Sequence, residues 1–482
     1  MPESIIYLKN IYYRYPKNRK YSLEDINISA SKGEFLAIMG AAGAGKTSFC
    51  RLINGIIPHI YGGSLSGTVT VSGLCTKDYS VPELAFKAGI VLDDPDAQIF
   101  TSTVYHEVTF GLQNILLPAD EIDKRAESAL YAVGLSGFED RIPMTLSGGE
   151  KQKLAIAAAL AMKSEILILD EPLSRLDPEA AAEVIAVLNE IREKFQITIV
   201  IASHNSSFIN GYADRVCILN NGKVTAMDTM QKIFGNSALL EENGIWPPVK
   251  EAGFSADLAA YTEYSKYSGN SISANPVIEI KNLSFSYPGS ECFKNLNLTV
   301  NQNDFAAIIG KNGCGKTTLL KIITGLLRPQ NGEVFINGRN TKGLSISEIS
   351  KEAGFVMQNP DNQLFTDSVY NEIAFALKNA HLSKKEIKQR VEYALKAVNL
   401  NDKDAFPHAL NKPDRTKTVI SCVLAMGCKI IILDEIDSSL DYNECTNIMN
   451  LLQDLNSRGF TIIFVTHNMT LAERYALRII KL

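Results

Sequence analysis

The strongest constraint on the fold of this 482-residue chain is that its two halves repeat one another. The motif GAAGAGKTS at 40–48 returns as GKNGCGKTT at 310–318, and ILILDEPLSRLD at 166–177 returns as IIILDEIDSSLD at 430–441. The motifs keep their order and a nearly constant offset. So long a period indicates two whole domains rather than a solenoid of short repeats.

The repeat predicts one domain over residues 1–240, a linker over 241–275 and a second domain over 276–482. The linker mixes a Pro pair with Ser, Gly and Tyr and has no sustained apolar period, and we expect a single short helix in it, around 255–265. Aligned on the repeat, the second copy stops at Leu482, where the first continues into an NNGK turn and a further helix. We therefore expect a shortened C-terminus in the second domain.

Apolar runs rich in β-branched residues predict buried parallel strands. Examples in the first copy are EFLAIMG at 34–40, ILILDE at 166–171 and TIVIAS at 198–203. These runs alternate with helical stretches, which is typical of an α/β layered fold. We expect a mainly parallel sheet at the core of each domain.

Composition argues against several classes of protein. A net charge of −5 lacks the clustered Lys and Arg that nucleic-acid binding requires, so no nucleic-acid partner is expected. No apolar run approaches the ~18–20 residues needed to cross a bilayer. The N-terminus has no basic segment followed by an apolar core, as a secretory signal would. The 8 cysteines are scattered, which favours reduced thiols in the cytosol.

Each GxxxxGK[ST] motif lies between an apolar run and a helical segment, which is the context of a phosphate-binding loop. Glycines let backbone N–H groups turn towards the phosphates, and the helix N-terminus adds positive potential. Lys46 and Lys316 are expected to reach the β- and γ-phosphates, and the hydroxyls of Thr47 and Thr317 to ligate Mg²⁺. The predicted nucleotide-binding residues of the two loops are Gly40, Gly43, Gly45, Lys46, Thr47, Ser48, Gly310, Gly313, Gly315, Lys316, Thr317 and Thr318.

Acidic pairs end one predicted strand in each copy. Asp170 and Asp434 can ligate Mg²⁺ at the carboxyl end of a strand. Glu171 and Glu435 follow at once and are candidates to position or deprotonate the attacking water. An ordinary Asp-Glu pair at a turn is the alternative, and the phosphate loop in the same domain favours the catalytic interpretation.

Two further pairs complete the candidate sites. His204 and His467 follow the next predicted strand and are candidate γ-phosphate sensors, with an ordinary surface histidine as the alternative. Tyr15 and Tyr287 precede proline ahead of each phosphate loop, and their rings could stack on adenine. A half-buried strand tyrosine is the rival interpretation, which the sequence leaves open.

The ordered set of aromatic residue, phosphate loop, Gln-loop, LSGGE, LDE, SxLD and His resembles the ABC-type ATPases over nearly the whole chain. The segment QNPDNQLFTDSVYNEIAFAL at 358–377, with its variant DDPDAQIFTSTVYHEVTFGL at 93–112, is similar to the ATPases of energy-coupling factor importers. Those importers take up vitamins or transition-metal ions. The resemblance implies two P-loop domains, each with a small antiparallel β part and a helical subdomain beside the parallel core. It also implies ATP and Mg²⁺ as cofactors.

The same resemblance implies integral membrane partners, a coupling transmembrane protein and a substrate-binding membrane subunit, reached from the cytoplasmic face of the membrane. Aromatic side chains are candidates for that docking surface, with core packing as the alternative explanation. They are Phe100, Tyr105, Phe110, Phe365, Tyr370 and Phe375. The rival functions are the ATPase of another ABC importer or exporter, and a soluble tandem ABC protein acting on ribosomes.

The resemblance further implies a head-to-tail pair of the two domains, with each ATP between the phosphate loop of one and the signature of the other. The site on Lys316 would then combine Gln358, as Gln-loop residue and Mg²⁺ ligand, with Ser147, Gly148 and Gly149 of LSGGEKQ. Every expected group is present at this site.

The site on Lys46 would depart from the pattern twice. Its Gln-loop position is Asp93, and the stretch 410–416 brings LNKPDRT in place of LSGGEKQ. Pro413 has no N–H to donate, and Asn411 replaces the signature serine. Lys412 supplies a positive charge, but at the end of a flexible side chain. We predict that the Lys46 site holds ATP and that the Lys316 site hydrolyses it.

Overall fold

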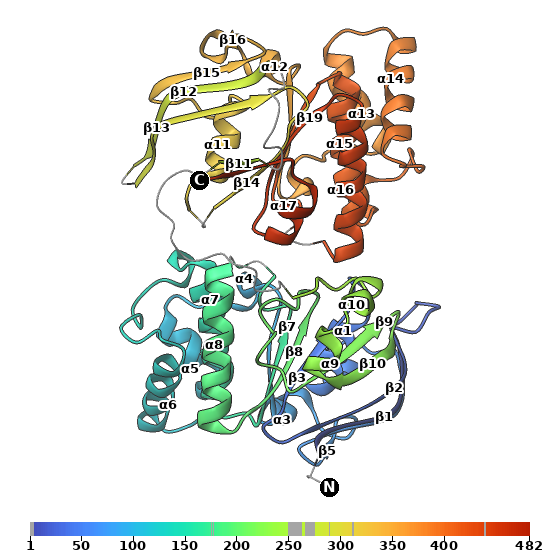
Figure 1. Ribbon diagram of the computed structural model, residues 1–482. Coiled ribbons are helices and arrows are strands. Elements are labelled where there is room, and N and C mark those ends of the chain that lie inside the picture. The colour runs from blue at the N-terminus through green and yellow to red at the C-terminus, as the bar shows by residue number, and fades with distance from the viewer. Residues whose placement is uncertain are drawn as a thin grey trace. The chain divides into compact units, whose positions relative to one another are not determined.

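The computed structural model describes residues 4–174, 176, 178–248, 263–265, 275–288, 290–310, 313–437 and 440–482. The chain folds into two units, Met1–Lys250 with Asp441–Asn443, and Glu251–Leu440 with Glu444–Leu482. Each unit contains a six-stranded sheet, a four-stranded sheet and flanking helices (Figure 1). The sequence repeat is therefore a repeat of structure.

The six-stranded sheet of the first unit has the order β10-β9-β3-β8-β7-β6 and is parallel except for β10, which pairs antiparallel with β9. Its strands are β3 (Phe35–Met39), β6 (Ala88–Val91), β7 (Ile166–Asp170), β8 (Thr198–Ser203), β9 (Arg215–Asn220) and β10 (Lys223–Thr229). Every residue of β3, β7 and β8 is buried, as parallel strands covered on both faces require. The predicted strands are confirmed.

The six-stranded sheet of the second unit has the order β11-β20-β14-β19-β18-β17. Its strands are β11 (Glu263–Ser265), β14 (Phe305–Ile309), β17 (Ala353–Val356), β18 (Ile430–Asp434), β19 (Thr461–Val465) and β20 (Arg478–Lys481). β14, β17, β18, β19 and β20 run parallel, and β11 pairs antiparallel with the edge strand β20. The carboxyl ends of β14, β18 and β19 therefore meet at one edge of the sheet, as do those of β3, β7 and β8 in the first unit.

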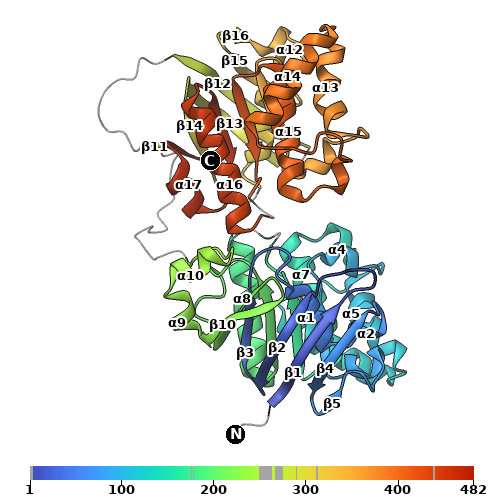
Figure 2. The same ribbon diagram turned by 90° about the vertical axis from the view of Figure 1, so that its right-hand side faces the viewer.

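A smaller antiparallel sheet covers the phosphate-loop helix in each unit. In the first unit it contains β1 (Ser4–Arg14), β2 (Leu23–Ser31), β4 (Ser64–Val71) and β5 (Leu74–Cys75), and in the second β12 (Pro276–Tyr287), β13 (Ser290–Asn301), β15 (Asn331–Ile336) and β16 (Arg339–Asn340). Helix α1 (Lys46–Ile53) contacts β4 as well as β7 and β8, so it lies between the two sheets (Figure 2). Its counterpart is α11 (Lys316–Ile323).

Helices flank the sheets of both units. In the first unit they are α2 (Ile56–His59), α3 (Val81–Ala85), α4 (Pro95–Gln98), α5 (Val104–Asn114), α6 (Ala119–Ala132), α7 (Gly148–Ala161), α8 (Pro178–Phe195), α9 (Met230–Phe234) and α10 (Ser237–Glu242). In the second they are α12 (Ile346–Ile349), α13 (Val369–Asn379), α14 (Lys384–Ala397), α15 (Lys412–Met426), α16 (Tyr442–Ser457) and α17 (Met469–Tyr475). Short 3₁₀ turns also occur, at Pro143–Thr145, Thr341–Gly343, Pro360–Asn362 and Pro407–Ala409.

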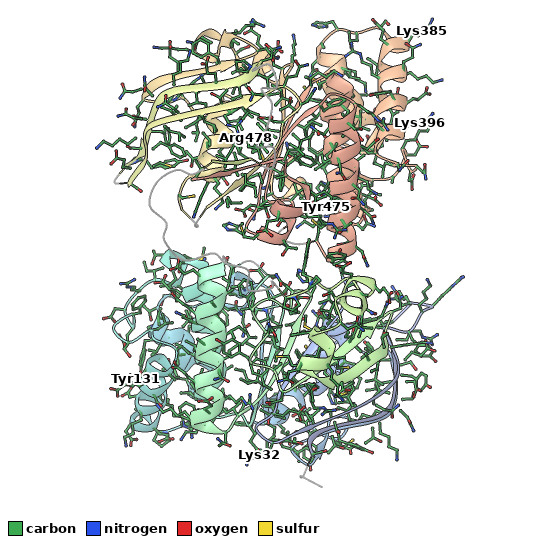
Figure 3. All side chains as sticks on the ribbon, viewed as in Figure 1. Lys32, Tyr131, Lys385, Lys396, Tyr475 and Arg478 are labelled. Carbon is green, nitrogen blue, oxygen red and sulfur yellow. The ribbon has the colours of Figure 1, made fainter. Side chains whose placement is uncertain are left out.

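The helical subdomain of each unit is a packed group of three helices, α5–α7 in the first and α13–α15 in the second. Helix α14 is amphipathic: Ile387, Val391 and Leu395 are buried at helical spacing. Lys385 and Lys396 are exposed on its outer side (Figure 3). Together the sheets and helices confirm the predicted α/β fold.

The segment expected to be a linker is described only in part. Helix α10 spans Ser237–Glu242, across the position where the linker was expected to begin, and Ile245 and Trp246 beyond it are buried in the first unit. The helix expected around 255–265 lies mostly outside the described residues. Its described end, Glu263–Ser265, is strand β11 instead, because the edge of β20 offers backbone partners.

None of the helices in the described part of the chain combines the length and the apolar character needed to span a membrane.

Candidate functional site

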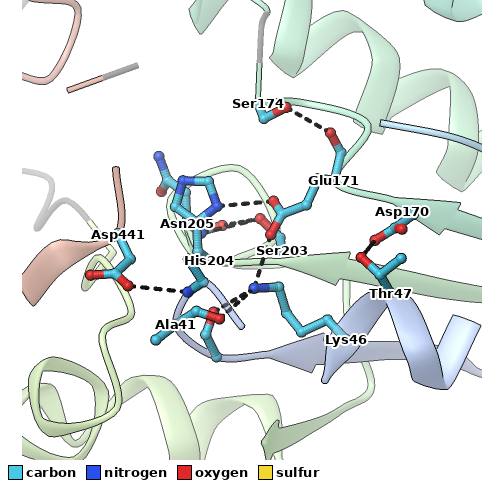
Figure 4. Close-up of polar contacts among 12 residues, drawn as sticks. Ala41, Lys46, Thr47, Asp170, Glu171, Ser174, Ser203, His204, Asn205 and Asp441 are labelled. Carbon is cyan, nitrogen blue, oxygen red and sulfur yellow. Dashed lines mark hydrogen bonds and ion pairs between the residues drawn. The ribbon is translucent and has the colours of Figure 1, made fainter. Parts of the chain in front are cut away.

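The first phosphate loop leads from β3 into α1 and holds Lys46 almost completely buried. The Lys46 Nζ donates to the carbonyl oxygens of Gly40 at 2.7 Å and Ala41 at 2.9 Å (Figure 4). Gly45 has φ 106° and caps the helix, and a Cβ there would lie 2.8 Å from the Ser22 carbonyl oxygen. Only glycine fits this turn, so the loop geometry is set by the sequence.

Each unit places the loop threonine against the aspartate that ends a central strand. The Thr47 hydroxyl donates to Asp170 at 3.2 Å, and the Thr317 hydroxyl lies 2.9 Å and 3.1 Å from the two carboxylate oxygens of Asp434. Burial raises the pKa of Asp170 to about 6, an effect that the Thr47 hydrogen bond opposes. Burial likewise raises the pKa of Asp434. A cation beside these carboxylates would favour their charged forms, so the pair fits a Mg²⁺ site.

In the first unit Glu171 lies between a lysine and a histidine. Its carboxylate is 3.1 Å from Lys46 Nζ, and it accepts a hydrogen bond from His204 Nδ1 at 3.0 Å (Figure 4). Burial works against the charged form, but the charges and hydrogen bonds of His204 and Lys46 outweigh it and lower the pKa of Glu171 to about 2. The Glu171 carboxylate therefore has a cationic partner at one oxygen and a histidine partner at the other.

In the second unit Glu435 has a different set of neighbours. The Gln358 amide donates to it at 3.0 Å, and His467 Nε2 donates at 3.0 Å. Lys316 is buried and its Nζ donates to the Gly310 carbonyl oxygen at 2.9 Å. Burial opposes the charge on Glu435, but the hydrogen bond and charge of His467, together with Lys316, lower its pKa overall. All the predicted catalytic groups of this unit therefore come together.

Asp93 occupies the place of Gln358 in the first unit. Its charge is one of the causes that raise the pKa of Asp170, after burial and the charge of Glu171. Among the described residues, no hydrogen bond joins Asp93 to Glu171. An ionised carboxylate has no proton to donate, so it cannot reproduce the Gln358 contact.

The two candidate adenine-stacking tyrosines make the same contact. The Tyr15 hydroxyl lies 3.1 Å from Ser48 Oγ, and the Tyr287 hydroxyl lies 3.3 Å from Thr318 Oγ1. Tyr287 is 42% exposed. Both rings therefore lie beside a phosphate-loop helix, and stacking on adenine stays a prediction.

The signature motif and its altered counterpart both begin a helix. Ser147 caps α7, with the Glu150 N–H donating to its hydroxyl at 3.3 Å. Asn411 caps α15, with the Asp414 N–H donating to its side chain at 2.9 Å. Gly148 and Gly149 open α7, whereas Lys412 and Pro413 open α15. The alteration therefore keeps the helix start and changes the groups that it presents.

Two residues shape the segment after each Gln-loop, and the sequence analysis gave neither of them a role, although both lie in the segment that it singled out. Gln363 accepts from the Met357 N–H at 2.8 Å and donates to the Phe355 carbonyl oxygen at 2.9 Å. Buried Glu372 accepts from the N–H groups of Phe365 at 3.0 Å and Thr366 at 2.8 Å. Gln98 and Glu107 make the same contacts in the first unit. Their identity in both copies was the signal that could have revealed them.

These contacts present an exposed aromatic pair in each unit. Phe365 and Phe375 are 64% and 44% exposed and meet edge to face at 4.8 Å. Phe100 and Phe110 are 66% and 43% exposed, with their ring centroids also 4.8 Å apart. Tyr105 and Tyr370 are only partly exposed. Exposure of the phenylalanines argues against core packing as their role.

Comparisons with known proteins agree with this geometry. The family model described as ABC transporter matches twice, over residues 23–174 and 293–438. A protein of Caldanaerobacter subterraneus named as an ABC transporter ATP-binding protein is 35% identical over 98% of this chain and 88% of its own length. One of the same description from Methanosarcina mazei is 36% identical over 99% of this chain and 93% of its own.

Among solved structures, cbiO1 from Clostridium perfringens, described as part of the ABC transporter complex cbiONQ, is 34% identical. It covers 50% of this chain and 94% of its own length, with a TM-score of 0.45. The family model and the relatives span both units and include both phosphate loops and both Asp-Glu pairs. The chain belongs to the ABC transporter family, as an ATP-hydrolysing protein with two ABC ATPase domains in tandem.

Proposed function

We propose that this chain energises a membrane importer of the energy-coupling factor type, and that it hydrolyses ATP at the Lys316 site while holding ATP at the Lys46 site. The importer type is supported by the PDxQ-[IL]-F segment, which occurs in both copies at the same place after the Gln-loop. The transported substrate would be a vitamin, a vitamin precursor or a transition-metal ion.

The observation that carries the asymmetry is the environment of the two glutamates. Glu435 accepts hydrogen bonds from Gln358, the expected Gln-loop residue and Mg²⁺ ligand, and from His467, the expected γ-phosphate sensor. Glu171 instead contacts Lys46 and His204, and the Gln358 position is taken by Asp93. Removing one preorganised hydrogen-bond donor that stabilises the transition state typically lowers the rate by ~10²–10³-fold. Turnover at the first site should therefore be slow.

The residues present fit Mg²⁺–ATP in both units. The phosphate loops would hold the phosphates, and Thr47 with Asp170, or Thr317 with Asp434, would hold the ion through oxygen atoms, as Mg²⁺ prefers. Bound Mg²⁺ would neutralise phosphate charge. Glu435 would then orient a water or accept its proton, and His467 would contact the γ-phosphate.

The signature residues are proposed to act across a head-to-tail pair of the two domains. Ser147, Gly148 and Gly149 offer a hydroxyl and open backbone N–H groups at the start of α7, suited to the phosphates of the Lys316 site. Pro413 removes an N–H from the corresponding position of α15. The first site would thus lose donors on two sides.

Membrane subunits would dock on the exposed aromatic pairs, Phe100 with Phe110 and Phe365 with Phe375. The chain would then lie at the cytoplasmic face of the membrane. Purification from native membranes should recover a coupling transmembrane protein together with a small substrate-binding membrane subunit. Recovery of membrane subunits of another importer or exporter type instead would contradict the assignment to energy-coupling factor importers.

The site asymmetry is tested by matched substitutions in the full chain. Glu435→Gln should abolish steady-state ATPase activity, because it removes the carboxylate from the complete site. Glu171→Gln should leave most of the activity. The measurement is phosphate release at saturating Mg²⁺–ATP, with thermal unfolding as the folding control. Equal losses of ATPase activity in the two variants would contradict the proposed asymmetry.

A further inference from the structure

A carboxylate that belongs to neither the Mg²⁺ pair nor the catalytic pair lies just beyond Glu435. Asp437 stands where the first copy has Leu173, a buried member of the first unit's hydrophobic core. The difference replaces an apolar side chain with an acidic one in the unit that keeps its complete set of catalytic groups. A carboxylate at such a position calls for a polar partner.

That partner comes from the strand end that carries the histidine. Asp437 Oδ2 accepts a hydrogen bond from the Thr466 hydroxyl at 2.6 Å, and the same hydroxyl accepts from the Asn468 N–H at 2.9 Å. Thr466 and Asn468 flank His467. The hydrogen-bonded chain therefore ties the turn after β18, which carries Glu435, to the turn after β19, which carries His467.

The charged groups that act on Asp437 are the catalytic ones. Burial raises the pKa of Asp437 to about 6, and the nearby charge of Glu435 acts in the same direction. The Thr466 hydrogen bond and His467 act in the opposite direction. Asp437 follows Glu435 by two residues, and its hydrogen-bond partner Thr466 directly precedes His467, so its placement bears on both turns.

The first unit keeps the inner contact, the Asn205 N–H donating to the Ser203 hydroxyl at 3.1 Å, but among its described residues it lacks the link from that hydroxyl to the glutamate turn. The Ser203 hydroxyl, at the place of Thr466, donates to the carbonyl oxygen of Asn205 in its own turn at 3.2 Å. The Trp246 N–H donates to the His204 carbonyl oxygen at 2.9 Å, and the Ser206 hydroxyl donates to the Trp246 carbonyl oxygen at 2.7 Å. Leu173 cannot take part in such a network. The link from the glutamate turn to the histidine turn through Asp437 is thus specific to the second unit.

We propose that Asp437 is a positioning residue of the Lys316 site, which through the Thr466 hydroxyl holds His467 in register with Glu435. The inference rests on the proposed assignment of this site as the hydrolytic one. Asp437 itself touches neither nucleotide nor water in this role. Its loss should therefore affect turnover rather than nucleotide affinity.

The test compares four variants of the full chain. Asp437→Leu, which introduces the first-copy residue, and Thr466→Val each remove one end of the hydrogen bond. Both should lower kcat about 10- to 100-fold, the scale of a small misplacement of catalytic groups, with KM for ATP changed by less than about twofold. Asp437→Asn keeps an acceptor and Thr466→Ser keeps the hydroxyl, so both should retain most of kcat.

Ser203→Ala provides the matched control, because its hydroxyl stays within its own turn. It should leave kcat nearly unchanged. The inference is overturned if Asp437→Leu keeps wild-type kcat in a protein that Glu435→Gln inactivates. It is also overturned if Asp437→Asn and Thr466→Ser lose as much kcat and melting temperature as Asp437→Leu and Thr466→Val. A loss of kcat in Ser203→Ala as large as that in Asp437→Leu would overturn it too. An active Glu435→Gln variant would instead overturn the proposed function, and this inference with it.

Discussion

At the scale of single residues, Tyr287 shows how one side chain can serve two purposes. Its hydroxyl contacts Thr318, while the residue is 42% exposed. If the ring stacks on adenine, Tyr287→Ala should raise KM for ATP by about 5- to 150-fold, because stacking contributes ~1–3 kcal/mol per base. Tyr287→Phe keeps the ring and should leave KM close to wild type. Steady-state ATPase kinetics measure both values, and similar KM values for the two variants would show that stacking is not the role of this ring.

The sequence alone predicted which residues belong to each site, but not which of them contact one another. The sequence placed Glu171 and Glu435 in equivalent positions, and the structure gives them different partners, Lys46 in one case and Gln358 in the other. Lys46 and Gln358 each lie far along the chain from the glutamate that they contact. Asp437 was not predicted as a site residue because its partner, Thr466, comes from the next strand of the sheet.

At the scale of elements, a buried carboxylate fixes the loop that precedes α13. Glu372 accepts from two backbone N–H groups, those of Phe365 and Thr366. Glu372→Ala would leave both donors without an acceptor, which should destabilise the second unit by about 2–3 kcal/mol. Urea unfolding of the full chain should show the loss in one transition. Glu386→Ala, which removes an exposed carboxylate from α14, should shift that transition less, and equal shifts would show that Glu372 does not fix the loop.

The elements of the fold differ in how well the sequence predicts them. Apolar runs such as ILILD predicted buried parallel strands correctly, because burial on both faces leaves a continuous apolar pattern. Gln363 and Glu372 lie inside the segment 358–377 that the sequence singled out, but their contacts could not be predicted, since their partners are backbone groups six to eight residues away. Trp246 likewise packs against the turn of His204, a contact between segments far apart in sequence.

At the scale of the whole molecule, the decisive question is whether the two ATPase domains act as a head-to-tail pair. Ser147 and Asn411 offer a matched comparison, since each caps its helix by accepting a backbone N–H. Replacing either with alanine should cost a similar ~1 kcal/mol in helix stability. A difference between them in ATPase activity therefore cannot come from the cap.

In the proposed pair, Ser147 serves the complete site on Lys316 and Asn411 serves the impaired site on Lys46. Ser147→Ala should then lower steady-state ATPase activity by ~10²-fold, because it removes a donor to the developing charge on the γ-phosphate. Asn411→Ala should leave the activity almost unchanged. Phosphate release and melting temperature are measured on the same preparations. Equal activity losses at equal melting temperatures would mean that the signature of the first domain does not complete the site of the second.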